Sequence, residues 1–227
     1  MARPLFQVVG WVDRLAQRES EIEALRQENV ALRDQIILLR EAQIENETLR
    51  RQLNFKSAVP NFQLLSAEVI GHDPNNLLQY LIIDRGTADG IEPGMPVLAG
   101  RGLVGRIAEA SASSSKVMLI TDPSSSVSAL VQRSRATGLV QGYSGHDLVM
   151  RYIPQGETVS PGDVVLTAGL GGNFPKRLVI GQVASVEHRD VMMFQEAKVL
   201  PSVSLRDLEV VMVLLNFTPI ELTPGDS

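Results

Sequence analysis

The sequence predicts a mainly β protein with an N-terminal α-helix, in which a long parallel dimeric coiled coil precedes two small six-stranded β-barrel domains. Three observations support this fold class. A seven-residue apolar repeat runs from Leu15 to Leu39, the character of the chain changes at Val59–Pro60, and two similar sets of short apolar segments follow. A seven-residue repeat keeps one stripe of a helix against a partner helix, whereas short apolar runs between turn residues are typical of strands.

The first fourteen residues form a separate apolar segment. The cluster is too short to span a bilayer, because Asp13 and Arg14 interrupt it, and it lacks the charged start of a signal peptide. We expect segment 1–14 to be the membrane-proximal end of a helix whose membrane-spanning part is missing, where Trp11 suits the interface. The alternative is a hydrophobic start to the coiled coil.

Residues 15–57 are predicted to form the coiled coil. Its contact stripe, called the seam here, consists of Leu15, Ile22, Leu25, Asn29, Leu32, Ile36 and Leu39. A single buried Asn at the first core position of a heptad favours two parallel strands in fixed register, so Asn29 predicts a parallel homodimer. Glu21 and Glu28 precede Arg26 and Arg33 by five residues, which is the spacing of ion pairs between parallel helices. The alternative is a long solvated helix packed on its own domain.

The second half of the predicted coil is weaker than the first. Beyond Leu39 the seam continues through Ala42, Asn46, Leu49 and Leu53 only if one extra three-residue step is inserted. Such a step overwinds a supercoil locally. We therefore expect the dimer to loosen toward the β region.

The β region is predicted to hold two copies of one six-stranded unit. Expected strands lie at about 65–70, 78–84, 95–99, 102–110, 116–121, 126–133, 137–143, 147–153, 163–168, 178–187, 194–200 and 209–215. Two pairs of residues occupy matching positions in the two copies. Pro93 matches Pro161 in a turn, and Gly105 matches Gly181 within a strand. The predicted domains are 62–135 and 136–217, with some strands allowed to cross between barrels, and 218–227 is a predicted flexible tail.

Composition argues against several functional classes. The net charge is −5 without a clustered basic face, so nucleic acid is not an expected partner. The chain has no cysteine and only three histidines at no metal-ligand spacing, so neither a metal nor another cofactor is expected. The motif Gly100–Gly105 matches GxGxxG, but no helix pattern follows it, and we expect a β-hairpin.

A Ser-His-Asp hydrolase is the alternative of a different class, since double β-barrels host that triad. Two His-Asp pairs occur, His72-Asp73 and His146-Asp147, and both are predicted to lie in hairpin turns. No serine lies in a context that would supply an oxyanion hole. We therefore expect no enzyme activity, and labelling by a serine-directed covalent probe separates the two classes.

The segment Ala168–Pro175 contains Gly169, Gly171, Gly172 and Phe174 and is called the Gly-rich loop here. It makes the second copy longer than the first, so the fold does not obviously require it. Three glycines followed by Phe174 and Pro175 predict positive φ values and a buried aromatic ring. The sequence leaves two interpretations of this loop open: a structural hairpin, or a loop for self-association or partner binding.

Four segments together resemble the MreC family of rod shape-determining proteins. They are Asp84–Met95, Gly102–Gly105, Leu119–Pro123 and Ala168–Gly181, and they occur in the family's order. Two positions depart from the family pattern, because Ala168 stands where Ser is usual and Arg177 stands where Gly is usual.

This resemblance implies a non-catalytic scaffold of the cell-elongation machinery. It implies self-association into dimers and filaments, and contacts with an MreD-like membrane protein and a class B penicillin-binding protein. It also implies a single-pass protein of the cytoplasmic membrane whose barrels lie on the periplasmic or extracellular side. These partners and this location are expectations from the resemblance alone.

Overall fold

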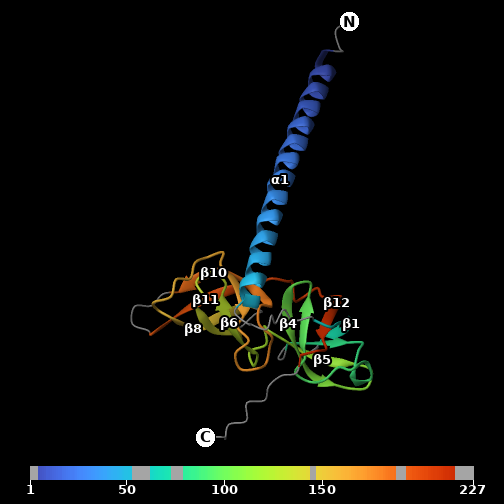
Figure 1. Cartoon of the computed structure of the whole chain (residues 1–227). Helices are drawn as coiled ribbons and strands as arrows, with labels where there is room; N and C mark the ends of the chain where they lie inside the picture. Colours follow the sequence, from blue (N-terminus) through green and yellow to red (C-terminus); the bar gives the residue numbers. More distant parts are fainter. Residues whose placement is uncertain (1–4, 53–61, 73–78, 144–146, 188–192, 218–227) are drawn as a thin grey trace. The chain divides into compact units, whose positions relative to one another are not determined.

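The computed structural model describes residues 5–52, 62–72, 79–143, 147–187 and 193–217, with α1 side chains described for residues 21–45. The chain divides into two compact units, residues 1–60 and 61–227. The first holds one helix and the second holds all the described strands (Figure 1).

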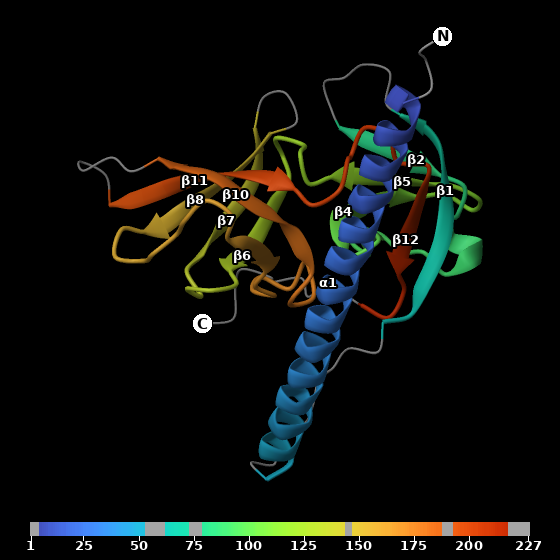
Figure 2. The same ribbon diagram turned by 90° about the horizontal axis from the view of Figure 1, so that it is seen from above.

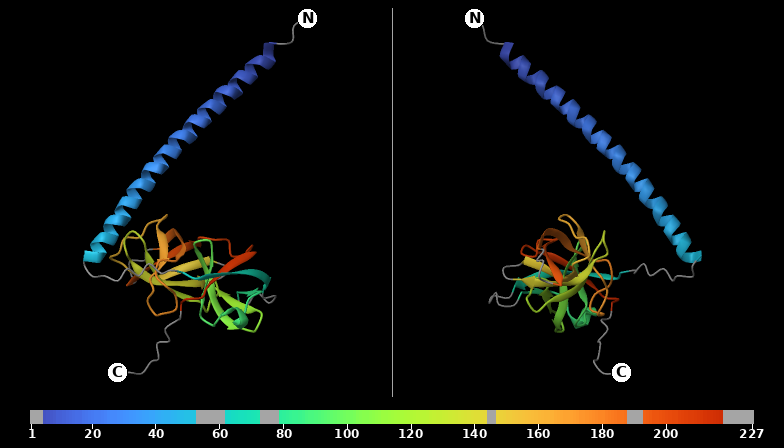
Figure 3. Two further views of the ribbon diagram at one scale, coloured as in Figure 1. Left: turned by 45° about the vertical axis from the view of Figure 1, so that its right-hand side comes forward. Right: turned by 90° about the vertical axis from the view of Figure 1, so that its left-hand side faces the viewer.

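The first unit is a single α-helix, α1, which spans Leu5–Gln52. At 1.5 Å per residue it is about 72 Å long, and Figure 3 shows it as one unbroken rod. The helix begins at Leu5 and runs without a break from the predicted membrane-proximal segment into the predicted coil. The predicted residues 53–57 of the coil lie outside the described part of the chain. Among the described residues, no helix is long and apolar enough to cross a membrane.

The second unit contains a closed ring of six strands, called the first ring, which is made of the first five strands of the chain and the last one. Its strands are β1 (Leu64–His72), β2 (Tyr80–Ile83), β3 (Pro96–Ala99), β4 (Gly102–Ala110), β5 (Ser115–Leu119) and β12 (Val210–Leu214). Hydrogen-bonded neighbours run β4-β3-β12-β1-β2-β5, and β5 pairs with β4 to close the ring. A short 3-10 helix, η1 (Thr87–Asp89), lies between β2 and β3.

The remaining strands close into a second ring. They are β6 (Ser126–Val131), β7 (Thr137–Tyr143), β8 (Asp147–Pro154), β9 (Val164–Thr167), β10 (Val179–Glu187) and β11 (Phe194–Pro201). Their order is β11-β8-β7-β6-β9-β10, closed by pairing of β10 with β11. Figure 2 shows the strands of the two rings as two groups. Closure leaves few strand edges open, which protects a β protein from edge-to-edge aggregation.

All twelve strands predicted from the sequence are confirmed in the described part of the chain, each with bounds within two residues of those expected. The hairpin expected at Gly100–Gly105 is also confirmed, because β3 and β4 pair on either side of Gly100 and Arg101. These segments were predictable because short apolar runs lie between clusters of turn residues.

The boundary predicted between residues 135 and 136 does not separate the rings. β6 lies before that boundary but pairs with β7 and β9, and β12 lies after it but pairs with β1 and β3. The strand crossing that the sequence analysis allowed is therefore present, and each ring takes one strand from the other half of the chain. A parallel contact of β10 with β4, at Val179 and Gly102, joins the rings directly.

The internal repeat is visible at the level of single backbone bonds. Gly94 and Gly162 have φ values of +88° and +89°. Their N–H groups donate to Ile107 and Val183 at 2.7 and 2.8 Å. A Cβ on Gly105 would lie 1.9 Å from the Met118 carbonyl oxygen, and one on Gly181 would lie 1.9 Å from that of Leu200. The two copies thus need glycine at equivalent places for the same steric reason.

The interior of the second unit is an apolar cluster drawn from both rings. Its large fully buried side chains include Leu81, Ile83, Ile91, Leu103, Ile107, Ile120, Leu148, Met150, Ile153 and Ile180. Each aliphatic side chain of this size contributes about 1.5–3 kcal/mol when it is removed from water. This shared core supports the strands that carry the exposed surfaces of the second unit.

Candidate interaction surfaces

The predicted seam is an uncovered apolar stripe on α1. The exposed fractions are 49% for Ile22, 54% for Leu25, 49% for Leu32, 49% for Ile36 and 70% for Leu39. Leu15 lies on the helix, but its side chain is outside the described residues. An apolar stripe at heptad spacing on a helix indicates contact with another element.

Polar residues of the seam region are also exposed. Asn29 lies within the stripe, and Glu21, Arg26, Glu28 and Arg33 flank it with their side chains in solvent. Arg26 makes an ion pair with Glu23 on the same helix, 3.7 Å between Nη1 and Oε2. Such an exposed pair contributes little to stability, so Arg26 remains available for a partner helix.

The Gly-rich loop is fixed from inside the second ring. Thr167, fully buried at the end of β9, donates its hydroxyl hydrogen to the Pro175 carbonyl at 2.5 Å and accepts from the Leu178 N–H at 2.9 Å. Phe174 is only 6% exposed and packs in the core. The buried aromatic ring expected from the sequence is therefore confirmed.

The outward part of the same loop is different in character. Gly169, Gly171 and Gly172 have positive φ values of 70°, 79° and 73°, which turns the chain sharply around Leu170. The side chain of Leu170 is 59% exposed. The loop thus combines an anchored base with one apolar side chain offered to solvent.

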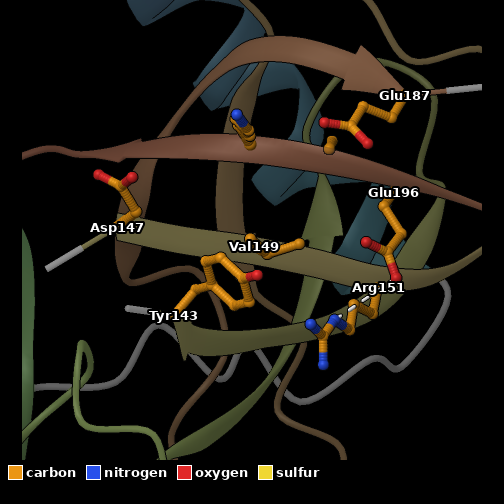
Figure 4. Close-up of a pocket in the computed structure, with 8 residues that line it drawn as sticks. Tyr143, Asp147, Val149, Arg151, Glu187 and Glu196 are labelled. Carbon is orange, nitrogen blue, oxygen red and sulfur yellow. Dashed lines mark ion pairs between the residues drawn. The ribbon is translucent and has the colours of Figure 1, made fainter. Parts of the chain in front are cut away.

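The sequence analysis missed a hollow on the outer face of the second ring. It has a volume of about 260 Å³ and is lined by Tyr143, Asp147, Val149, Arg151, Glu187, Glu196, Ala197 and Lys198 (Figure 4). Nε of Arg151 lies 3.4 Å from Oε1 of Glu196, and its guanidinium carbon lies 5.8 Å from the centre of the Tyr143 ring. These residues come from β7, β8, β10 and β11, so no local motif in the sequence marks the hollow.

An exposed aromatic pair lies on β8 and β11. The rings of Tyr152 and Phe194 meet edge to face, with centroids 5.9 Å apart, and the neighbouring Met193 is 83% exposed. Tyr152 has φ of +60°, an uncommon conformation for a bulky residue. The only signal in the sequence was two aromatic residues in amphipathic strands, which does not predict the backbone angle.

Each of the two His-Asp pairs considered for catalysis has one member among the described residues. His72 lies exposed at the end of β1 and Asp147 lies exposed at the start of β8, while Asp73 and His146 lie outside the described residues. Among the described residues, no three acidic or histidine side chains form a group that could hold a metal ion.

One ionisable side chain has a clearly perturbed pKa. Burial raises the pKa of Tyr80 on β2, the charge of Asp122 raises it further, and Lys116 opposes the change. Nζ of Lys116 lies 5.7 Å from the ring centre of Tyr80. The Tyr80 side chain therefore stays neutral at physiological pH.

The fold and these surfaces define a class: a β-barrel protein with a helical stalk whose notable features are contact surfaces. The family model described as "Rod shape-determining protein MreC, barrel core" matches residues 69–215. The chain belongs to the MreC family.

Individual relatives agree with this assignment. The cell shape-determining protein MreC of Listeria monocytogenes is 31% identical over 221 residues, which is 95% of this chain and 69% of that protein. The corresponding proteins of Haemophilus influenzae and Escherichia coli are both 28% identical, and the chain spans 60% and 54% of their lengths. The chain therefore corresponds to about half to two thirds of these relatives.

Solved structures show the same fold. MreC from Listeria monocytogenes aligns with a TM-score of 0.69 at 30% identity, covering 94% of this chain and 96% of that one. A structure described as the major periplasmic domain of the cell shape-determining filament MreC aligns with a TM-score of 0.61 at 26% identity, covering 69% and 98%. MreC in a complex with penicillin-binding protein PBP2 from Helicobacter pylori aligns with a TM-score of 0.57 at 15% identity, covering 69% and 99%, and shares the fold.

Proposed function

We propose that this chain is a non-catalytic scaffold of the bacterial cell-elongation machinery, maintaining rod shape by organising peptidoglycan synthases outside the cytoplasmic membrane. The observation that carries the proposal is the MreC barrel core at residues 69–215. The same chain bears an uncovered apolar seam on α1. A platform that holds partners needs contact surfaces rather than a catalytic group.

Dimerisation through α1 is the first part of the scaffold. Burying Ile22, Leu25, Leu32 and Ile36 against a second copy removes their half-exposed side chains from water. Asn29 pairs with its counterpart and fixes the register, while Glu21 and Glu28 meet Arg26 and Arg33 of the second helix. Two β units are then carried on one stalk.

The proposed partners are a class B penicillin-binding protein and an MreD-like membrane protein. The complex of MreC with PBP2 from Helicobacter pylori supports the first, since the two MreC chains share a fold. The second rests on the family alone. The exposed aromatic pair Tyr152–Phe194 and the Leu170 side chain are candidate contact points on the second ring.

The proposed location is the cytoplasmic membrane, as part of a single-pass protein with the β unit on the periplasmic or extracellular side. The apolar residues of segment 1–14 and Trp11 support a membrane-proximal start. The solved periplasmic domain of a relative supports the side of the membrane.

The partner proposal is tested by cross-linking in envelope membranes. A tagged copy of the full chain is expressed in its own host and cross-linked. It should capture the class B penicillin-binding protein, identified by mass spectrometry of its peptides. A seam variant with Ile22→Gln and Ile36→Gln serves as the matched control for the contribution of dimerisation. Failure of the folded wild-type chain to capture that enzyme would contradict the proposal.

Self-assembly through the Gly-rich loop is tested separately. Leu170→Ser removes the exposed apolar side chain of the loop and leaves the buried Phe174 and the Pro175 carbonyl in place. We expect an unchanged β fold by circular dichroism and a loss of assemblies in electron micrographs. Wild-type assembly of the Leu170→Ser chain would assign the loop a structural role only.

A further inference from the structure

A second apolar row lies on α1 away from the seam. Val30, Ile37 and Ile44 are spaced seven residues apart and are exposed by 59%, 57% and 56%. They are called the outer row here. Glu23 occupies the preceding position of the same heptad series, so the row begins at Val30.

The outer row cannot share the interface that the seam forms. Val30 and Ile37 each follow a first core position of the heptad by one residue, as Ile37 follows Ile36. In a coiled coil of 3.5 residues per turn, that places both about 130° around the helix from the centre of the seam. Ile44 lies beyond the three-residue step, two residues after Ala42, and is also outside the seam. A helix that buries its seam in a dimer therefore leaves the outer row on the outside. Branched aliphatic side chains repeated on the outer face of a stalk indicate a further contact.

The charges beside the outer row favour a second copy as the occupant. Arg26, Arg33 and Arg40 line one side of it, and Asp34 and Glu41 line the other, all exposed. When two such faces meet in parallel, the arginine side of each helix lies against the acidic side of the other. In an antiparallel arrangement arginines would face arginines, which is repulsive.

We propose that the outer row joins two coiled-coil dimers side by side in parallel, so that α1 has one interface for the dimer and a second for a dimer of dimers. This inference rests on the proposed dimerisation through the seam. The contact is isologous, because the same face is used by both copies. Only three apolar side chains per helix take part, so the association is weak and depends on concentration.

The test compares neighbouring isoleucines on the full chain by sedimentation velocity over a wide range of concentration. Wild type should pass from dimer to tetramer as concentration rises. Ile37→Gln combined with Ile44→Gln should retain the dimer and weaken tetramer formation by at least about tenfold. Ile36→Gln, one residue away in the seam, should instead weaken the dimer.

A charge variant tests the parallel arrangement without altering the apolar row. Asp34→Lys with Glu41→Lys places positive charge against the arginines of the second dimer, so the tetramer should weaken and the dimer should persist. A wild-type chain that stops at the dimer, or an outer-row variant with the wild-type tetramer constant, would overturn the inference while leaving dimerisation intact. A wild-type monomer at every concentration would overturn both.

Two other occupants have distinct signatures that would also overturn the inference. If the row packs against the chain's own β unit, the outer-row variant lowers the melting temperature of that unit in a dilute sample. If it binds a helix of a foreign protein, wild type alone stays dimeric, and the variant loses that protein in cross-linked membranes.

Discussion

Arg177 occupies a backbone conformation that suits glycine. Its φ is +72°, and its N–H donates to the Thr167 carbonyl at 3.0 Å, which holds it there. The family resemblance had marked this position as one where Gly is usual, and the structure supplies the reason. A left-handed conformation costs a residue with a Cβ roughly 1–2 kcal/mol.

Arg177→Gly is therefore expected to stabilise the chain by about 1 kcal/mol after the extra entropy of glycine in the unfolded state is counted. Denaturant unfolding measures this change. Arg101→Gly is the control, because Arg101 lies in the equivalent turn with no positive φ recorded, and it should not stabilise. Equal effects at the two positions would show that backbone strain is not the cause.

Thr167 anchors the Gly-rich loop through its hydroxyl group. Thr167→Val keeps the shape but removes the donor to Pro175 and the acceptor for Leu178, so buried polar groups lose their partners. We expect a loss of about 1–3 kcal/mol in the free energy of unfolding. Thr167→Ser retains the hydroxyl and should lose less. A valine variant as stable as wild type would refute the anchoring role.

At the scale of elements, the strands were predictable and their grouping was not. Short apolar runs between clusters of turn residues marked all twelve strands. The ring to which a strand belongs depends on its pairing with distant segments. The local sequences of β6 (Ser126–Val131) and β12 (Val210–Leu214) therefore do not predict that each pairs with strands of the other half of the β region. The hollow at Arg151 and Glu196 was not predicted for the same reason, because its side chains come from strands that are distant in the sequence.

The seam of α1 gives a prediction about the choice of oligomer. Asn29 would be buried between the helices of the proposed dimer, so Asn29→Leu should raise the stability of the helix pair by about 2 kcal/mol, because an apolar side chain replaces an amide at that core. The same change should allow oligomers larger than two, since Asn selects the two-stranded register. Thermal unfolding and sedimentation equilibrium measure the two effects. A variant that is less stable than wild type would place Asn29 outside the core.

For the whole molecule, the proposed scaffold combines the β unit with a helix that we propose brings two copies together. The second unit has an apolar interior shared by both rings, and the two sequence repeats of the chain exchange one strand between the rings. The first unit supplies the exposed seam. The proposed scaffold would hold its partners at fixed spacing, and the rest of the proposal depends on dimerisation through α1.

The most direct test of that step uses a chain that has no cysteine of its own. In a parallel dimer the two copies of residue 29 face each other, so Asn29→Cys should form a disulfide between chains under mild oxidation. Asp34→Cys, on the outer face of the dimer, should form far less at low concentration. Rapid, nearly complete cross-linking at position 29 alone is the predicted result. Absence of cross-linking at 29 in a folded chain, or equal cross-linking at 34, would contradict the parallel coiled-coil dimer.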